Sequence, residues 1–180
     1  MQLKQFQFSV EVYGSSAELS TNDAALLAEA RNITKAAYAP YSNFFVGAAA
    51  KLANGIIVKG TNQENASYPV AICAERTLMS VAATQYPGIA IETMAISYDN
   101  KNGESIKPIS PCGVCRQMLA EYEDRTAHAI KIILGGLTGE VYIIHTAKDL
   151  LPLTFTGFFI NAANKTYYPN SAWSHCHPCK

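Results

Sequence analysis

Two cysteine motifs constrain this chain more than any other feature of its sequence. The first, Cys73–Arg76 (C-A-E-R), places a thiol two positions before a carboxylate. The second, Pro111–Cys115 (P-C-G-V-C), carries two more thiols three positions apart. A fold that brings the two motifs together offers one metal ion three thiolates, with a carboxylate beside them. We therefore expect the chain to fold around the meeting point of these segments.

Zn²⁺ fits this ligand set best. It binds cysteine sulfur at about 2.3 Å in a tetrahedron, and a catalytic zinc leaves its fourth position to water. A structural zinc site normally has a fourth protein ligand, which these motifs do not supply. Cys112 and Cys115 are spaced so that the first turn of a helix points both sulfurs to one side. Cys73 and Glu75 differ by two, so Cys73 is expected at the entry of its own helix.

At these motifs the chain resembles the cytidine deaminases of the homo-oligomeric, free-nucleoside type, a branch of the zinc-dependent deaminases. Three further segments resemble that family in the same order, namely Tyr38–Ala49, Gly60–Tyr68 and Leu150–Phe155. The resemblance spans roughly residues 22 to 156. A lone C-x-x-C would be a weak signal, whereas motifs that agree in order and spacing are a specific one.

The resemblance implies an α/β fold, a three-layer α/β/α sandwich around a mixed five-stranded sheet. It also implies hydrolytic deamination of cytidine and 2′-deoxycytidine in pyrimidine salvage, with one Zn²⁺ per subunit held by Cys73, Cys112 and Cys115. Glu75 would act as the proton shuttle, because a carboxylate beside the zinc is a base of ordinary strength that is not used as a ligand. Arg76 would hydrogen-bond the ligand sulfurs; a surface arginine is the alternative.

Substrate contacts also follow from the resemblance. Asn62 and Glu64 match positions that hold the ribose 3′-hydroxyl, and Phe44 matches an aromatic ring packed against the pyrimidine. The backbone of Ala74 matches a contact to the amide edge of the base.

Two aromatic residues match positions at or across a subunit boundary. These are Tyr68 and Phe155, for which ordinary core packing is the alternative. The family resemblance, rather than any periodicity of this sequence, implies a homotetramer.

Composition narrows the classes of protein to which the chain can belong. A length of 180 residues suits one domain, 1–180, and the 49% apolar share is typical of a globular protein. Lys plus Arg equals Asp plus Glu at 14 each, so no basic excess favours nucleic acid. No stretch approaches the roughly 20 apolar residues of a membrane span. Five cysteines, three of them explained as ligands, favour the reducing cytoplasm.

Two other functions remain open at this point. A deaminase that edits tRNA or single-stranded DNA needs a cationic channel and usually has histidine as its first ligand, whereas this chain has Cys73. The other alternative is a zinc-stabilised binding protein without catalysis, in which Glu75 would be a bystander. The presence of Glu75 argues against it.

The chain extends past the resemblance at both ends. Alternation of apolar and polar residues over Phe6–Tyr13 predicts an additional half-buried strand within residues 1–20, either an edge strand or a subunit contact. Residues 161–180 form a C-terminal extension that ends in Ser174–Cys179 (S-H-C-H-P-C), a segment rich in metal ligands. Adventitious metal binding and attachment to a neighbouring subunit are both open for it.

Periodicity and turn residues predict the elements between these ends. A helix is expected after the N-cap candidates Thr21, Asn22 and Asp23, and Pro40 ends it. The other expected elements are a hairpin of strands 44–53 and 56–61, helices 73–86 and 112–122, and strands 93–98, 130–134 and 141–145.

Overall fold

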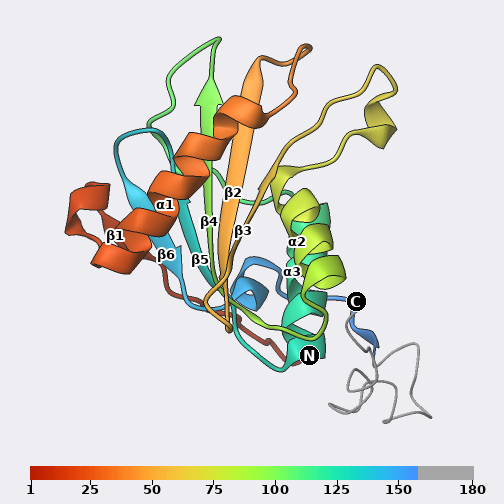
Figure 1. Ribbon diagram of the computed structural model, residues 1–180. Coiled ribbons are helices and arrows are strands. Elements are labelled where there is room, and N and C mark those ends of the chain that lie inside the picture. The colour runs from red at the N-terminus through yellow and green to blue at the C-terminus, as the bar shows by residue number, and fades with distance from the viewer. Residues whose placement is uncertain (158–180) are drawn as a thin grey trace.

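The computed structural model describes residues 1–157 and shows one mixed sheet with helices on both faces (Figure 1). The sheet order is β1-β6-β5-β4-β2-β3, in which β4 and β5 are parallel and the other neighbours antiparallel. The strands are β1 Glu11–Tyr13, β2 Phe44–Leu52, β3 Ile57–Thr61, β4 Ile91–Asn100, β5 Lys131–Gly135 and β6 Val141–Ile144. The predicted α/β/α sandwich is confirmed. The predicted count of five strands is wrong by one. The sheet has six strands, because β1 pairs with β6.

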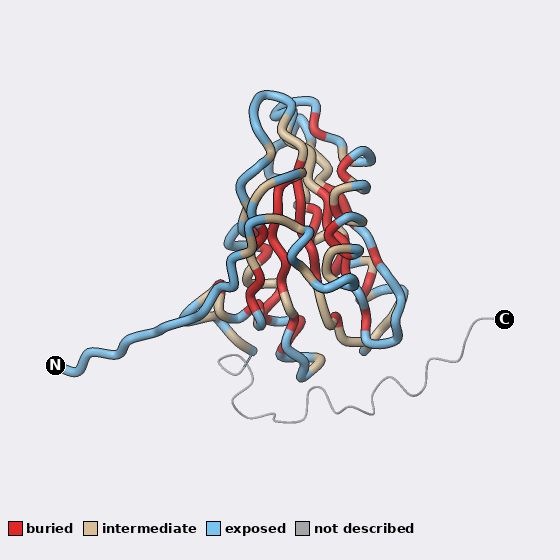
Figure 2. The backbone as a smooth tube through the Cα atoms, turned by 90° about the vertical axis from the view of Figure 1, so that its left-hand side faces the viewer, coloured by how far each residue is buried: buried red, intermediate tan, exposed pale blue. Residues whose placement is uncertain are grey.

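Three helices form the outer layers. Helix α1 (Thr21–Ile33) covers one face, and α2 (Ala74–Gln85) and α3 (Gly113–Thr126) cover the other. Each interface is a separate apolar cluster: Leu27 and Ala30 pack on the sheet under α1, whereas Leu78 and Leu119 pack under α2 and α3. Buried residues accordingly concentrate along the middle of the molecule (Figure 2).

The inner strand β2 contacts both helical layers because its side chains alternate between the two faces of the sheet. Ala49 belongs to the α1 cluster, while Ala48 and Ala50 belong to the cluster of α2 and α3. Two glycines let the helices approach closely. A Cβ on Gly47 would lie 2.2 Å from the Ala30 carbonyl oxygen of α1. A Cβ on Gly60 would lie 2.5 Å from the carbonyl oxygen of Ala74, the first residue of α2.

The N-terminal strand is shorter than predicted. Only Glu11–Tyr13 is strand, paired with Val141–Ile143 of β6. Because β6 ends at Ile144, it offers almost no backbone beyond this ladder for the preceding residues to pair with. Residues 1–10 leave the body as an extended arm (Figure 2), and the Phe6 and Phe8 side chains are about half exposed.

Smaller differences concern element ends. The N-cap of α1 is Ser20, whose hydroxyl accepts a hydrogen bond from the Asp23 backbone N–H, one residue before the predicted candidates. The helix ends at Ile33, and a 3₁₀ turn, Thr34–Ala36, continues towards Pro40. Within residues 1–157 no helix has the length and apolarity needed to cross a membrane.

Candidate metal and catalytic site

The three predicted zinc ligands meet at the starts of two helices. Cys73 is the residue before α2, Cys112 is the residue before α3, and Cys115 lies in the first turn of α3. The Cys73 Sγ lies 3.7 Å from the Cys112 Sγ, which lies 3.5 Å from the Cys115 Sγ. All three sulfurs fall within 4.8 Å of one another. The positions expected from the spacing are confirmed: Cys73 lies at the entry of one helix, and Cys112 and Cys115 lie at the start of another.

This donor set suits zinc. A hydrogen bond from the Cys115 thiol lowers the pKa of Cys73 to about 6, against the opposing effects of burial and the Glu75 charge. The same contact, followed by burial, raises the pKa of Cys115. The three sulfurs are close enough to bind a common cation. A divalent ion takes the place of the thiol protons, and Zn²⁺ prefers this tetrahedral sulfur set.

Glu75 is the second residue of α2 and is only 5% exposed. Burial raises the pKa of its carboxyl, while hydrogen bonds from its own backbone N–H and the Cys115 thiol act in the opposite direction. The contact with Cys115 places this carboxyl beside the sulfur cluster. A buried carboxyl with a raised pKa, next to a metal site, can act in turn as a proton acceptor and a proton donor.

Arg76 lines a groove between α2 and α3 together with Val114 and Gln117. Its positive charge helps to lower the pKa of Cys73, although the Cys115 hydrogen bond has the larger effect. In the described part of the chain, Arg76 makes no hydrogen bond to a cysteine sulfur. Its influence on the cluster is therefore through space.

Backbone pairing between Gln63 and Ile72 places the predicted sugar-binding residues next to the metal cluster. Gln63 exchanges two backbone hydrogen bonds with Ile72, the residue before Cys73, at 2.9 and 3.0 Å. On its other side, Gln63 is bridged to Tyr38. Asn62 and Glu64 flank Gln63, so their positions are fixed relative to Cys73.

Asn62 holds the start of β2, and Glu64 holds the loop before it. The Asn62 amide donates to the Phe44 carbonyl oxygen at 2.9 Å and accepts from the Val46 N–H at 2.7 Å. The Glu64 carboxylate accepts from the Tyr41 N–H at 2.9 Å and from the backbone and hydroxyl of Ser42. Although burial acts in the opposite direction, these hydrogen bonds lower the pKa of Glu64. Asn62 and Glu64 thus have a positioning role that sequence reasoning missed.

Tyr98 is a further residue that sequence reasoning missed. Its ring, on β4, stacks on Phe44 with the centroids 4.8 Å apart and the planes 16° apart. Tyr98 is 5% exposed, whereas Phe44 is half-buried. The pairing depends on the register of β2 against β4, which no local pattern reveals. The Phe44 ring therefore has a fixed orientation.

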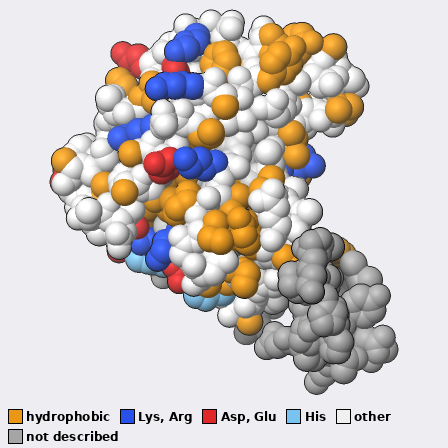
Figure 3. Space-filling view, in the orientation of Figure 1, with side chains coloured by type: hydrophobic (Ala, Val, Ile, Leu, Met, Phe, Trp, Pro, Cys, Tyr) orange, Lys and Arg blue, Asp and Glu red, His pale blue; other side chains and the backbone are white. Residues whose placement is uncertain are grey.

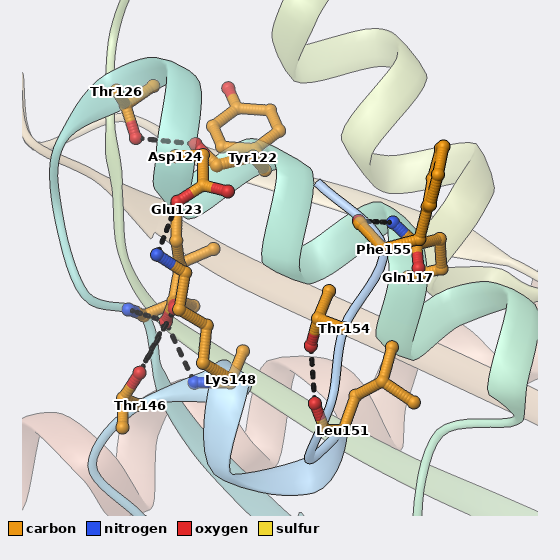
Figure 4. Close-up of polar contacts among 12 residues, drawn as sticks. Gln117, Tyr122, Glu123, Asp124, Thr126, Thr146, Lys148, Leu151, Thr154 and Phe155 are labelled. Carbon is orange, nitrogen blue, oxygen red and sulfur yellow. Dashed lines mark hydrogen bonds and ion pairs between the residues drawn. The ribbon is translucent and has the colours of Figure 1, made fainter. Parts of the chain in front are cut away.

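The two aromatic residues expected near a subunit boundary are both exposed. Tyr68 is 73% exposed and meets Tyr41 edge to face at 6.0 Å. Phe155 is 57% exposed, and its carbonyl accepts a hydrogen bond from Gln117 of α3 at 2.7 Å (Figure 4). Core packing, the alternative considered from sequence, is excluded for both within this single chain.

A buried carboxylate fixes the segment that leads to Phe155. Glu123 is 3% exposed, and its Oε1 accepts from the N–H groups of Ile130 and Ala147 at 2.7 and 2.8 Å. The Thr146 hydroxyl donates to the same carboxylate (Figure 4). These bonds join the end of α3 to the starts of β5 and of the 3₁₀ turn Ala147–Leu150, so the C-terminal segment follows α3 closely.

Arg116 joins the same segment to the metal motif. Its guanidinium donates to the Pro111 carbonyl at 2.8 Å and to the Leu150 carbonyl at 3.0 Å. Pro111 immediately precedes Cys112, so one side chain holds both the approach to a metal ligand and the end of the 3₁₀ turn.

On the face seen in Figure 3, basic and acidic side chains lie beside one another. Three of the lysines in the described chain pair with carboxylates across neighbouring elements: Lys51 with Glu92, Lys59 with Glu29, and Lys131 with Asp23. Apolar side chains gather at the upper right, over the loops before β2 and after β3, and again in the lower middle of this face.

Comparisons with known proteins agree with this geometry. The family model described as "Cytidine and deoxycytidylate deaminase zinc-binding region" matches residues 20–130. A cytidine deaminase of Halalkalibacterium halodurans is 38% identical over 136 residues, which are 76% of this chain and 96% of that protein. A cytidine deaminase of Sporosarcina psychrophila is 36% identical over 132 residues, covering 73% and 89% of the two chains.

Solved structures give the same result. A cytidine deaminase from Burkholderia pseudomallei superposes with a TM-score of 0.63 at 37% identity, covering 76% of this chain and all of that one. A cytidine deaminase from Mycobacterium tuberculosis superposes with a TM-score of 0.59 at 28% identity, covering 76% and 98%.

Proposed function

Because the chain belongs to the cytidine and deoxycytidylate deaminase family, we propose that it hydrolyses cytidine and 2′-deoxycytidine to uridine and 2′-deoxyuridine with release of ammonia, a step of pyrimidine salvage. One observation carries the proposal: the buried Glu75 carboxyl lies beside the Cys73, Cys112 and Cys115 sulfurs. Neither an editing deaminase nor an inactive zinc protein is favoured by any contact at this site.

Zinc held by the three cysteines would supply a water molecule whose pKa is lowered towards about 7. The chain's own residues then handle the protons. Glu75 takes a proton from the attacking water and delivers it to N3 of the ring while the C–O bond forms at C4. Glu75 then transfers the second proton of that water to the exocyclic amine, and the C–N bond breaks to release ammonia. Its raised pKa suits a group that must accept and donate in turn.

The remaining residues would bind and orient the nucleoside. Phe44, held by Tyr98, would pack on the pyrimidine, and the Ala74 backbone at the start of α2 would meet the amide edge of the base. Asn62 and Glu64 would bind the ribose 3′-hydroxyl through the hydrogen-bonding capacity of the amide and the carboxylate that the bonds within the chain do not use. The hydrogen bonds between Asn62 and the start of β2, and between Glu64 and the loop before it, set the direction of those groups.

Substrate size is the sharpest test of this proposal. Kinetics on zinc-loaded protein are expected to rank cytidine and 2′-deoxycytidine well above 3′-deoxycytidine, cytidine 5′-monophosphate and a single-stranded oligonucleotide. A site built around a substrate hydroxyl can reject the analogue that lacks it by about 10⁴ to 10⁵. An oligonucleotide that proved the best substrate would overturn the nucleoside proposal in favour of an editing deaminase.

We also propose a homotetramer in which Phe155 or Tyr68 approaches the site of a neighbouring subunit. Its support is the exposure of both rings close to segments of the site. Sedimentation equilibrium is expected to give four chains per particle, and Phe155→Ala should raise the KM for cytidine more than the exposed-site control Val70→Ala. A fully active monomer would contradict both parts.

We also propose a single domain and a reducing compartment. The described strands belong to one sheet, which supports a single domain over residues 1–180. Three free cysteines at one site support a reducing compartment, the cytoplasm. The extension 161–180 lies outside the described residues.

A further inference from the structure

The N-terminal arm, residues 1–10, has the sequence pattern of a half-buried strand, yet its apolar side chains are exposed in the single chain. Phe6, Phe8 and Val10 alternate with polar residues, as in a strand with one buried face. In the described part of the chain, residues 1–10 belong to no strand ladder, and these three side chains are 37 to 53% exposed. The arm lies outside the segment matched by the family model.

The arm continues the edge strand β1 without a break. Tyr13 packs against the cluster under α1, so Val12 and the even-numbered residues before it point to the other face of the extended chain. Val12 is itself 59% exposed. β1 uses one backbone edge to pair with β6, and among residues 1–157 no strand lies beside its other edge. An edge of this kind is a template for another strand.

The arm is complementary to a second copy of itself. Antiparallel pairing about a two-fold axis through Ser9 sets Phe6 opposite the partner's Val12 and Phe8 opposite the partner's Val10. Every apolar residue from 6 to 12 then meets an apolar one, in the aromatic and β-branched pairs that stabilise sheets. On the other face, Gln7 meets the partner's Glu11, so like charges do not face each other. A shift of one residue in either direction would set Phe8 against Ser9 or Glu11.

We propose that the arms of two copies of this chain pair in this antiparallel register and join their sheets edge to edge at β1. The contact is isologous and closes on itself. It stands apart from the deaminase proposal, since no arm residue belongs to the site, and it adds a contact outside the family-matched segment.

Disulfide trapping tests the register directly. Ser9→Cys is nearly isosteric and places each new thiol opposite its own copy. Opposite residues in antiparallel strands have Cα atoms about 4.5 to 5.5 Å apart, within the range that a disulfide spans. The matched control is Gln5→Cys, on the same face of the same arm. Its two copies would lie roughly 26 Å apart, eight residues at about 3.3 Å each. Both are made in full-length, zinc-loaded protein carrying Cys176→Ser and Cys179→Ser.

Mild oxidation is expected to give at least about fivefold more covalent dimer from Ser9→Cys than from Gln5→Cys. Adding Phe6→Gln and Phe8→Gln should abolish that dimer, while circular dichroism and zinc content stay unchanged because the arm is outside the core. Equal cross-linking of the two thiols, no cross-linking at Ser9→Cys, or a dimer that survives the phenylalanine substitutions would each overturn the proposal.

Discussion

Replacing Glu75 with glutamine is expected to lower kcat for cytidine by about 10² to 10⁴ or more, the range that general acid and base groups contribute. The amide has nearly the same shape as the carboxyl and fills the same buried site, where Glu75 is only 5% exposed. It cannot accept a proton from water and return it to the ring. Zinc content and the melting temperature should therefore stay close to those of the unchanged chain.

The matched control for this variant is Glu121→Gln, which removes an exposed carboxylate from α3. We expect it to retain full activity. If Glu75→Gln instead kept activity within about tenfold of the original protein, Glu75 would have no role as acid and base.

Cys112→Ser is expected to abolish stoichiometric zinc binding and, with it, activity. The Cys112 sulfur lies 3.7 Å from the Cys73 sulfur and 3.5 Å from the Cys115 sulfur, and its loss leaves two ligands. Metal analysis after dialysis should show about one zinc per chain in the original protein and far less in the variant. Because zinc sites couple to folding, the variant should also melt at a lower temperature.

The C-terminal Cys and His residues provide the control for metal binding. Cys176→Ser with Cys179→Ser should keep one zinc and full activity. Zinc that vanished from this tail variant but persisted in Cys112→Ser would move the metal site to the tail.

The site was predictable because its chemistry is encoded locally. The spacing of Cys112 and Cys115 within one helical turn, and the position of Cys73 before its helix, follow from helix geometry alone. The alternation in the strands and the Asn54-Gly55 turn similarly located most of the sheet.

Other features depend on partners distant in sequence. Phe6–Tyr13 has the pattern of a full strand, yet only its last three residues find a ladder, because the length of β6 limits the pairing. The stacking of Tyr98 on Phe44 requires the register between β2 and β4. The Glu123 carboxylate accepts hydrogen bonds from two segments, Ile130 before β5 and Thr146–Ala147 at the 3₁₀ turn, and nothing near it in sequence indicates this.

The most direct test of the central claim is the conversion of cytidine by protein that carries one zinc per chain. Loss of the cytidine absorbance and release of ammonia are followed together in the same sample. We predict one uridine and one ammonia for each cytidine consumed, with turnover abolished when a chelator removes the zinc. Fully zinc-loaded, folded protein that left cytidine unchanged would contradict the assignment of this site to nucleoside deamination.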